Sequence, residues 1–243
     1  MKKPFYSLLI GLLFSLGSLC AHGAEATSQA IVLKVKGTVN YTMPGQTTPV
    51  ALKVGDKLPQ GATIVTGAKS EASIQAFNGA VAYIMPDTTA NLEKLSVTTS
   101  GGVVTKQTAL LNLKVGTILS TIDPANHNIN DYGIRTPKGV AAARGTAYGV
   151  TVTTTGKVQL FVTNSAVTFT NSTTGKSITV PAGSAVAVHE DGTFETVPFS
   201  SLDQGFITVL EDAYGKFQEV GGEGSTSTTG TYDPNTTPQS PNH

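Results

Sequence analysis

Short runs of alternating apolar and polar residues, separated by turn residues, occupy the chain from about residue 29 to residue 197. Residues 72–77 form one such run, which ends at Asn78-Gly79, and residues 81–84 form the next. Alternation with a period of two is typical of half-buried strands, and Asn-Gly is a strong hairpin signal. Further strand patterns cover residues 31–35, 38–41, 62–65, 148–153, 158–163, 166–170, 177–180 and 185–189. Many short strands predict an all-β fold, either a multi-stranded sandwich or a short β-solenoid of stacked strands.

One tetrapeptide, Leu-Lys-Val-Gly, occurs at residues 52–55 and again at residues 113–116. A repeat of this kind would fit the stacked units of a β-solenoid. Because all four residue types are common in proteins, a chance match is an equal alternative.

The period of the pattern changes after Pro198. Apolar residues then follow helical spacing at Leu202, Phe206, Val209, Leu210, Ala213 and Phe217. We predict one amphipathic helix within residues 198–220 that packs on the β core and is capped by Ser200 or Ser201. A partner-binding helix is the alternative. Residues 221–243 hold almost no apolar side chain, which predicts a disordered tail.

The N-terminus has the pattern of an export signal. Met1-Lys2-Lys3 precedes an apolar run over residues 5–20, and small residues then permit cleavage before Ala24 or before Thr27. We predict a signal peptide at residues 1–23, a β domain at residues 29–197, and a periplasmic, cell-surface or secreted protein without a transmembrane span after cleavage. An uncleaved anchor and lipidation of Cys20 are the alternatives. Cleavage would leave no cysteine, and therefore no disulfide and no thiolate chemistry.

The charge of the chain is balanced, with 16 Lys and Arg against 16 Asp and Glu. Charged residues are 13% of the sequence, and no segment concentrates the basic ones. A nucleic-acid-binding protein normally carries a basic surface, so we expect no nucleic-acid partner. Apolar residues, at 39%, are frequent enough for a folded core.

Residues 133–150 contain Thr136-Pro137, a run of three alanines, and then Arg144-Gly145-Thr146. This stretch resembles the signature of FecR-like domains, in which a strand ending in Thr-Pro is followed by small residues, Arg-Gly-Thr and another strand. Residues 54–58 are similar to the opening of that family and residues 181–186 to its closing turn and strand. The resemblance covers roughly residues 34–195.

The resemblance implies a module that lies outside the cytoplasm. The best-known members of the family are transmembrane regulators of iron–siderophore uptake, with a cytoplasmic domain that binds a sigma factor and this β domain outside. Only residues 1–4 precede the apolar run of this chain, so we expect no sigma-factor-binding domain in it. The resemblance then implies the outer module alone, with another envelope protein or a surface glycan as its partner.

We interpret the signature residues Thr136, Pro137, Arg144, Gly145 and Thr146 as structural. Pro137 forces an extended or turn conformation on Thr136, and Gly145 permits a bend with positive φ. Arg144 follows an apolar run, and a buried guanidinium would need carboxylate or carbonyl partners. We predict that Arg144 bonds backbone carbonyls and locks the turn; an arginine that contacts a ligand is the alternative.

The most polar loop of the chain is the candidate contact loop, because binding residues concentrate on loops. Its predicted contact residues are Asp123, Asn126, Asn128, Asn130 and Asp131. Their oxygens would suit Ca²⁺, but no Gly stands at the sixth position from Asn126, and Pro137 occupies the place of the bidentate Glu. We therefore predict no metal site.

The sequence also contains no catalytic motif. His127, His189 and His243 are far apart, and neither a zinc-ligand spacing nor Gly-x-Ser-x-Gly occurs. We predict no catalytic residue and no cofactor. The predicted function is an exported, non-catalytic FecR-like binding or scaffolding module of the bacterial envelope, with a link to cell-surface signalling. The alternatives are a self-associating structural or adhesive surface protein and an enzyme acting on cell-wall or carbohydrate material.

Overall fold

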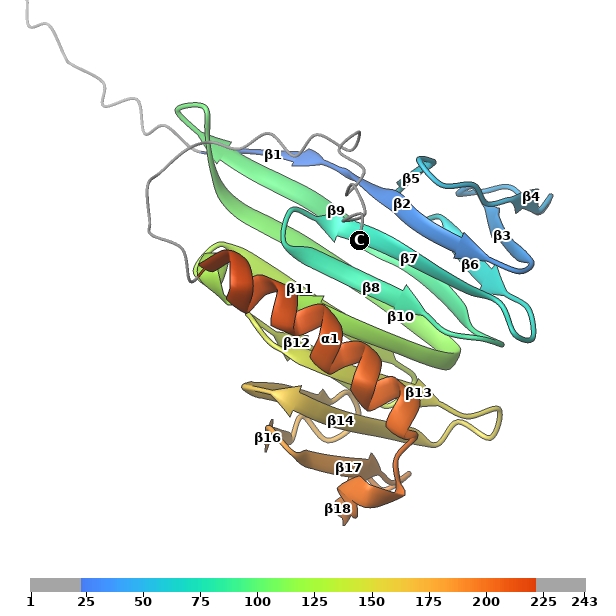
Figure 1. The fold of residues 1–243 in the computed structure, drawn as a ribbon, viewed down its shortest axis with the longest axis vertical. Coiled ribbons are helices and arrows are strands. Elements are labelled where there is room, and N and C mark those ends of the chain that lie inside the picture. The colour runs from blue at the N-terminus through green and yellow to red at the C-terminus, as the bar shows by residue number, and fades with distance from the viewer. Residues whose placement is uncertain (1–22, 222–243) are drawn as a thin grey trace, which may run out of the picture.

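The computed structural model describes residues 23–221, and these fold into two β-sheets, here named A and B, and one α-helix (Figure 1). Across sheet A the strands follow in the order β4 (Val50–Ala51), β3 (Val39–Thr42), β6 (Thr63–Thr66), β9 (Thr89–Ser100), β10 (Val103–Ile122), β11 (Asn130–Thr136), β12 (Gly139–Ala143), β15 (Ala166–Asn171) and β16 (Ser177–Pro181). Across sheet B the order is β5 (Lys57–Pro59), β2 (Gln29–Lys36), β7 (Glu71–Phe77), β8 (Ala80–Ile84), β10 again, β13 (Ala147–Val152), β14 (Val158–Asn164), β17 (Ser184–Val188) and β18 (Phe194–Val197). The short strand β1 (Ala24–Thr27) extends sheet A along the last residues of β9.

From β7 onward the chain adds hairpins to the two sheets in turn. The hairpins β7–β8, β13–β14 and β17–β18 lie in sheet B, whereas β11–β12 and β15–β16 lie in sheet A. Among the described strand pairs, only β10 with β11 is parallel. The predicted all-β fold is confirmed, and the structure is a two-layer sandwich built from stacked hairpins. The sequence pattern predicted no strand over residues 89–122, where the structure has the long strands β9 and β10, of 12 and 20 residues.

The long strand β10 passes from sheet A to sheet B at Gly116. Residues 103–115 pair with β9, while residues 116–122 pair with β13 and β8. Gly116 has a φ of 98°, and a Cβ there would lie 2.5 Å from the Cα of Thr88. Glycine is therefore required at this crossing. The other copy of the tetrapeptide, residues 52–55, leads into a turn after β4, so the two copies are not a structural repeat.

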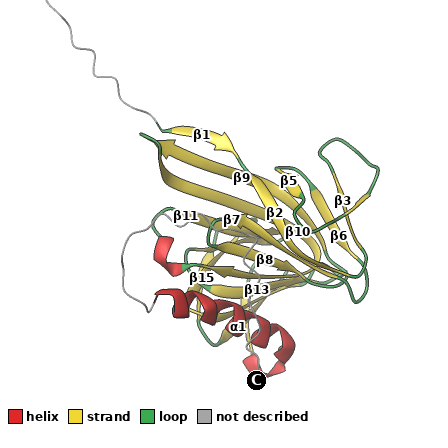
Figure 2. Ribbon diagram, turned by 45° about the horizontal axis from the view of Figure 1, so that its top comes forward, coloured by secondary structure: helices red, strands yellow, loops and turns green. Residues whose placement is uncertain are grey.

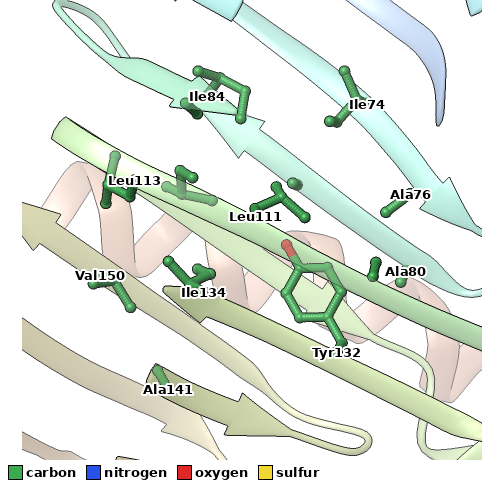
Figure 3. Close-up of a cluster of buried hydrophobic side chains, with 14 of the residues drawn as sticks. Ile74, Ala76, Ala80, Ile84, Leu111, Leu113, Tyr132, Ile134, Ala141 and Val150 are labelled. Carbon is green, nitrogen blue, oxygen red and sulfur yellow. The ribbon is translucent and has the colours of Figure 1, made fainter. Parts of the chain in front are cut away.

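The core lies between the facing surfaces of the two sheets. Ile74 and Ile84 of sheet B and Leu111, Leu113 and Ile134 of sheet A are fully buried in one continuous cluster (Figure 3). Alternate residues of each strand point into this layer, which is the arrangement that the period-two pattern predicts. Each such side chain contributes roughly 1.5–3 kcal/mol to folding through the apolar surface it buries.

The helix α1 (Gln204–Gly221) lies against the outer face of sheet B (Figure 2). Leu210 of the helix is fully buried against side chains of β10, β13, β14 and β17. The predicted cap is wrong, because Ser201 ends a short 3₁₀ helix, η2 (Phe199–Ser201), before α1 begins. Asp203 takes the capping role, since its Oδ1 accepts a 2.8 Å hydrogen bond from the backbone N–H of Gly205.

The outer face of sheet A is left uncovered by the described helix. Ala142, Ala166 and Thr168 are exposed on it. Within residues 23–221, no helix is both long and apolar enough to span a membrane. The predicted signal peptide and the predicted tail lie outside the described residues, apart from Gly23 and Gly221.

Candidate functional site

Arg144 stands just beyond the end of β12, on the outer surface of sheet A. Its side chain is exposed, and it forms no hydrogen bond or ion pair with another residue of the described part of the chain. The prediction that Arg144 bonds backbone carbonyls is therefore wrong, because its side chain points away from the protein. The reason is the pleat of β12: Ala141 and Ala143 point into the core, so Ala142 and Arg144 point outward.

The backbone that carries Arg144 is fixed by the next two residues. Gly145 has a φ of 96°, the bend that the sequence predicts, and it packs directly on Pro124. Thr146 is fully buried, and its hydroxyl donates a hydrogen bond to the carbonyl of Asn164. The carbonyl of Thr146 accepts a 2.8 Å hydrogen bond from the N–H of Ile122. Arg144 is thus a free cation held on a rigid turn.

The other two signature residues, Thr136 and Pro137, lie at the opposite end of the β11–β12 hairpin. The hydroxyl of Thr136 accepts hydrogen bonds of 3.2 Å from the N–H groups of Lys138 and Gly139, and it donates a 3.0 Å bond to the Gly139 carbonyl. Pro137 is exposed in the turn. These two residues shape the hairpin turn and do not approach Arg144.

The predicted contact loop is divided by the structure into inward and outward residues. Asp123 caps the short 3₁₀ helix η1 (Pro124–Asn126), with its Oδ1 accepting a 2.8 Å bond from the N–H of Ala125. Asn130 is buried, and its Oδ1 accepts a 3.2 Å bond from the side chain of Gln107. These two side chains hold the loop in place.

Three of the predicted loop residues remain available at the surface. Asn128 is exposed, and Asn126 and Asp131 are half-buried. Asp131 forms an ion pair of 2.9 Å with Lys106 of β10. Since Lys106 balances the charge of Asp131, the loop leaves the charge of Arg144 uncompensated.

A hollow of about 300 Å³ connects the loop with the signature turn. Its walls are formed by Asp131, Ala142, Ala143, Arg144, Ala166 and Thr168. The Arg-Gly-Thr turn and the loop, which the sequence presents as separate candidates, therefore form one surface. A guanidinium presents several N–H donors in a planar fork that matches a carboxylate, and the small residues beside it leave room for one.

The comparisons with known proteins find a similarity for the part of the chain that carries this surface. Residues 62–168 match the family model described as FecR protein. This segment is similar to a FecR domain. The match runs from the start of β6 into β15 and includes both Arg144 and the loop at residues 123–131. The segments that resemble the opening and the closing of the family, residues 54–58 and 181–186, lie outside it.

No curated protein matches the chain. Among solved structures, two crystal structures, at 1.65 and 2.50 Å resolution, of a provisionally assigned anti-sigma factor from Parabacteroides distasonis ATCC 8503 are similar. Each has 11% sequence identity and a TM-score of 0.45, and the alignment covers 56% of this chain. The chain spans only 59% of the length of that protein. The FecR domain itself fits a module of cell-surface signalling.

Proposed function

We propose that this chain is an exported, non-catalytic binding module of the bacterial envelope, and that it acts in the periplasm, at the cell surface or outside the cell. The export signal in the sequence and the FecR domain support this location. The proposed partner is another envelope protein, which presents a carboxylate to Arg144.

The observation that carries this proposal is the state of Arg144. It is exposed, it lacks a partner among the described residues, and it stands on a turn that Gly145 and Thr146 hold rigid. Because the backbone of the turn is already fixed, binding at Arg144 needs no further ordering of the main chain, and arginine is enriched among the residues that dominate interface energies. The uncovered face of sheet A provides a surface around it that a partner can cover.

Site-specific photo-crosslinking in the living cell tests this function. A photoreactive amino acid at Thr168, which lines the hollow beside Arg144, is expected to capture one defined envelope protein. The same amino acid at Val54, 64% exposed in a turn near the other end of the sequence, is the matched control and is expected to capture nothing specific. Capture of the same proteins at both positions, or turnover of an envelope substrate by the purified chain, would argue against a binding module of this kind.

Self-association is the second candidate, because the uncovered face of sheet A is also available to a second copy. Its signature in the same experiment is a crosslink from Thr168 to another molecule of this chain. Light scattering then separates the two functions, since only self-association predicts a mass that rises with protein concentration.

A further inference from the structure

A second hollow, of about 430 Å³, lies at the opposite end of the β11–β12 hairpin from Arg144. Three turns that are distant in the sequence form it: the turn between β11 and β12, the turn between β13 and β14, and the turn between β17 and β18. Apolar residues of β14 and β17 line part of it, and its polar residues are Lys138, Thr155, Lys157, His189, Glu190 and Glu195.

Lys138 is the central feature of this hollow. Its side chain is only 16% exposed, so the aliphatic stem is packed against the protein. Its ammonium forms no hydrogen bond with another residue of the described chain, and its ion pair with Glu190 is long, at 4.0 Å. The Glu190 side chain is 93% exposed and lies at the rim. The ammonium of Lys138 therefore keeps its donors for a ligand.

The other charged residues of the hollow also favour binding of an anion. Glu195 is engaged by His189, since its Oε2 lies 2.9 Å from the ring Nε2. Lys157 is a second basic residue of the lining, and it is exposed and forms no ion pair with another residue in the described range. Two lysines thus line a hollow in which one carboxylate is occupied by His189 and the other stands at the exposed rim.

We infer that this hollow binds a small ligand carrying an oxyanion, a carboxylate or a phosphate, between the ammonium groups of Lys138 and Lys157. The anion would take the hydrogen bonds that Lys138 does not make within the protein, and Glu190 would swing away into solvent. This site lies at the other end of β12 from the Arg144 surface and does not depend on the function proposed for that surface.

Amide chemical shifts of the ¹⁵N-labelled chain test the inference. The probes are galacturonate as a carboxylate, inorganic phosphate, and galactose with sodium chloride at the same ionic strength as a neutral control. We expect galacturonate or phosphate to shift the amides of residues 138–139, 155–158 and 189–193 in a saturable way, and galactose to leave them unchanged. The anion that binds with the higher affinity shows whether the natural ligand carries a carboxylate or a phosphate.

Two substitutions with opposite expected effects make the test decisive. Lys138→Met keeps the buried stem and removes the charge, so it is expected to weaken anion binding by about tenfold or more. Glu190→Gln removes the competing carboxylate and is expected to strengthen binding several-fold. Lys53→Met, in the exposed turn after β4 at the opposite edge of sheet A from β16, is the control and leaves binding unchanged. Absence of saturable shifts, or equal affinity of the Lys138→Met and native chains, would overturn the inference.

Discussion

A Cβ atom at position 145 would lie only 2.7 Å from the Cα of Pro124. Gly145 therefore joins the signature turn to the contact loop by direct backbone packing. No side chain fits between the two segments, because the obstacle is backbone and not a flexible side chain. This contact holds Arg144 beside the loop and makes the two sequence candidates one surface.

Replacement of Gly145 by alanine is expected to destabilise the fold and displace the loop. The left-handed backbone costs a non-glycine residue roughly 1–2 kcal/mol, and the overpacking against Pro124 adds a similar amount, so we expect a loss of about 2–4 kcal/mol in the free energy of unfolding. Gly175→Ala is the matched control, since Gly175 has a φ of 67° and open space around it, and only the backbone term applies. Urea unfolding measures both variants, and equal losses would contradict the packing role of Gly145.

Tyr148 is buried in the core, and its hydroxyl has no hydrogen-bond partner among residues 23–221, whereas the hydroxyl of Tyr132 lies 2.9 Å from the Oγ of Ser120. An unsatisfied buried hydroxyl is a cost, so Tyr148→Phe is expected to be neutral or stabilising. Tyr132→Phe leaves Ser120 unpaired and is expected to cost about 1 kcal/mol. Thermal and urea unfolding of the two variants compare these effects. The explanation fails if Tyr148→Phe is the more damaging change.

The same tyrosines predict a loss of stability at high pH. Burial raises the pKa of Tyr148, and that of Tyr132, well above the ordinary value of 10.0. The unfolded chain therefore loses these protons first, so their contribution is complete below about pH 10 and declines as the pH rises above it. Removal of one of them in Tyr148→Phe is expected to reduce the decline by about 1.4 kcal/mol per pH unit. Urea unfolding between pH 9 and about pH 11 measures the two slopes, and identical slopes would contradict the burial of Tyr148.

Strand β1 is expected to loosen in acid. The pKa of Glu25 is lowered by its hydrogen bond to Ser96, then by its hydrogen bond to Lys94 and the charge of Lys94. A lowered pKa stabilises the folded state above the ordinary value of 4.5 and loses that effect as the pH falls through the folded-state pKa. Protection factors for amide exchange in residues 24–27 are therefore expected to fall below pH 4.5.

The control for this prediction is Glu25→Gln, which removes the carboxylate. It is expected to show weak protection of β1 at neutral pH and no further loss in acid. A native chain whose β1 protection is the same at neutral and acid pH would show that the contacts of Glu25 do not hold β1.

Most strands of this fold follow from the alternation of residues alone. The predicted run at residues 72–77 lies within β7, and Asn78-Gly79 is the turn to β8. The long strands β9 and β10 escaped prediction because both contain many polar residues and β10 also contains Gly116, so that they resemble loops locally. Their pairing is decided by tertiary contacts, such as the approach of Gly116 to Thr88.

The candidate site was only partly predictable for a related reason. The period of two along β12 was sufficient to place Arg144 outside, because Ala141 and Ala143 are inward positions two residues apart. The family signature instead drew attention to a buried arginine. The lysine hollow gave no sequence signal, since Lys138, Lys157 and His189 come from three separate turns that only the stacked hairpins bring together.

The most direct test of the central claim is a crosslinking pull-down from the native envelope with the native chain, Arg144→Ala and Arg144→Lys. All three are expected to fold with the same unfolding midpoint, because Arg144 is exposed and makes no hydrogen bond or ion pair within the described chain. Arg144→Ala should lose the partner, Arg144→Lys should bind it more weakly, and Lys53→Ala, an exposed lysine near the N-terminal end of the fold, should retain it fully. Retention of the partner by a folded Arg144→Ala chain would contradict a binding surface centred on Arg144.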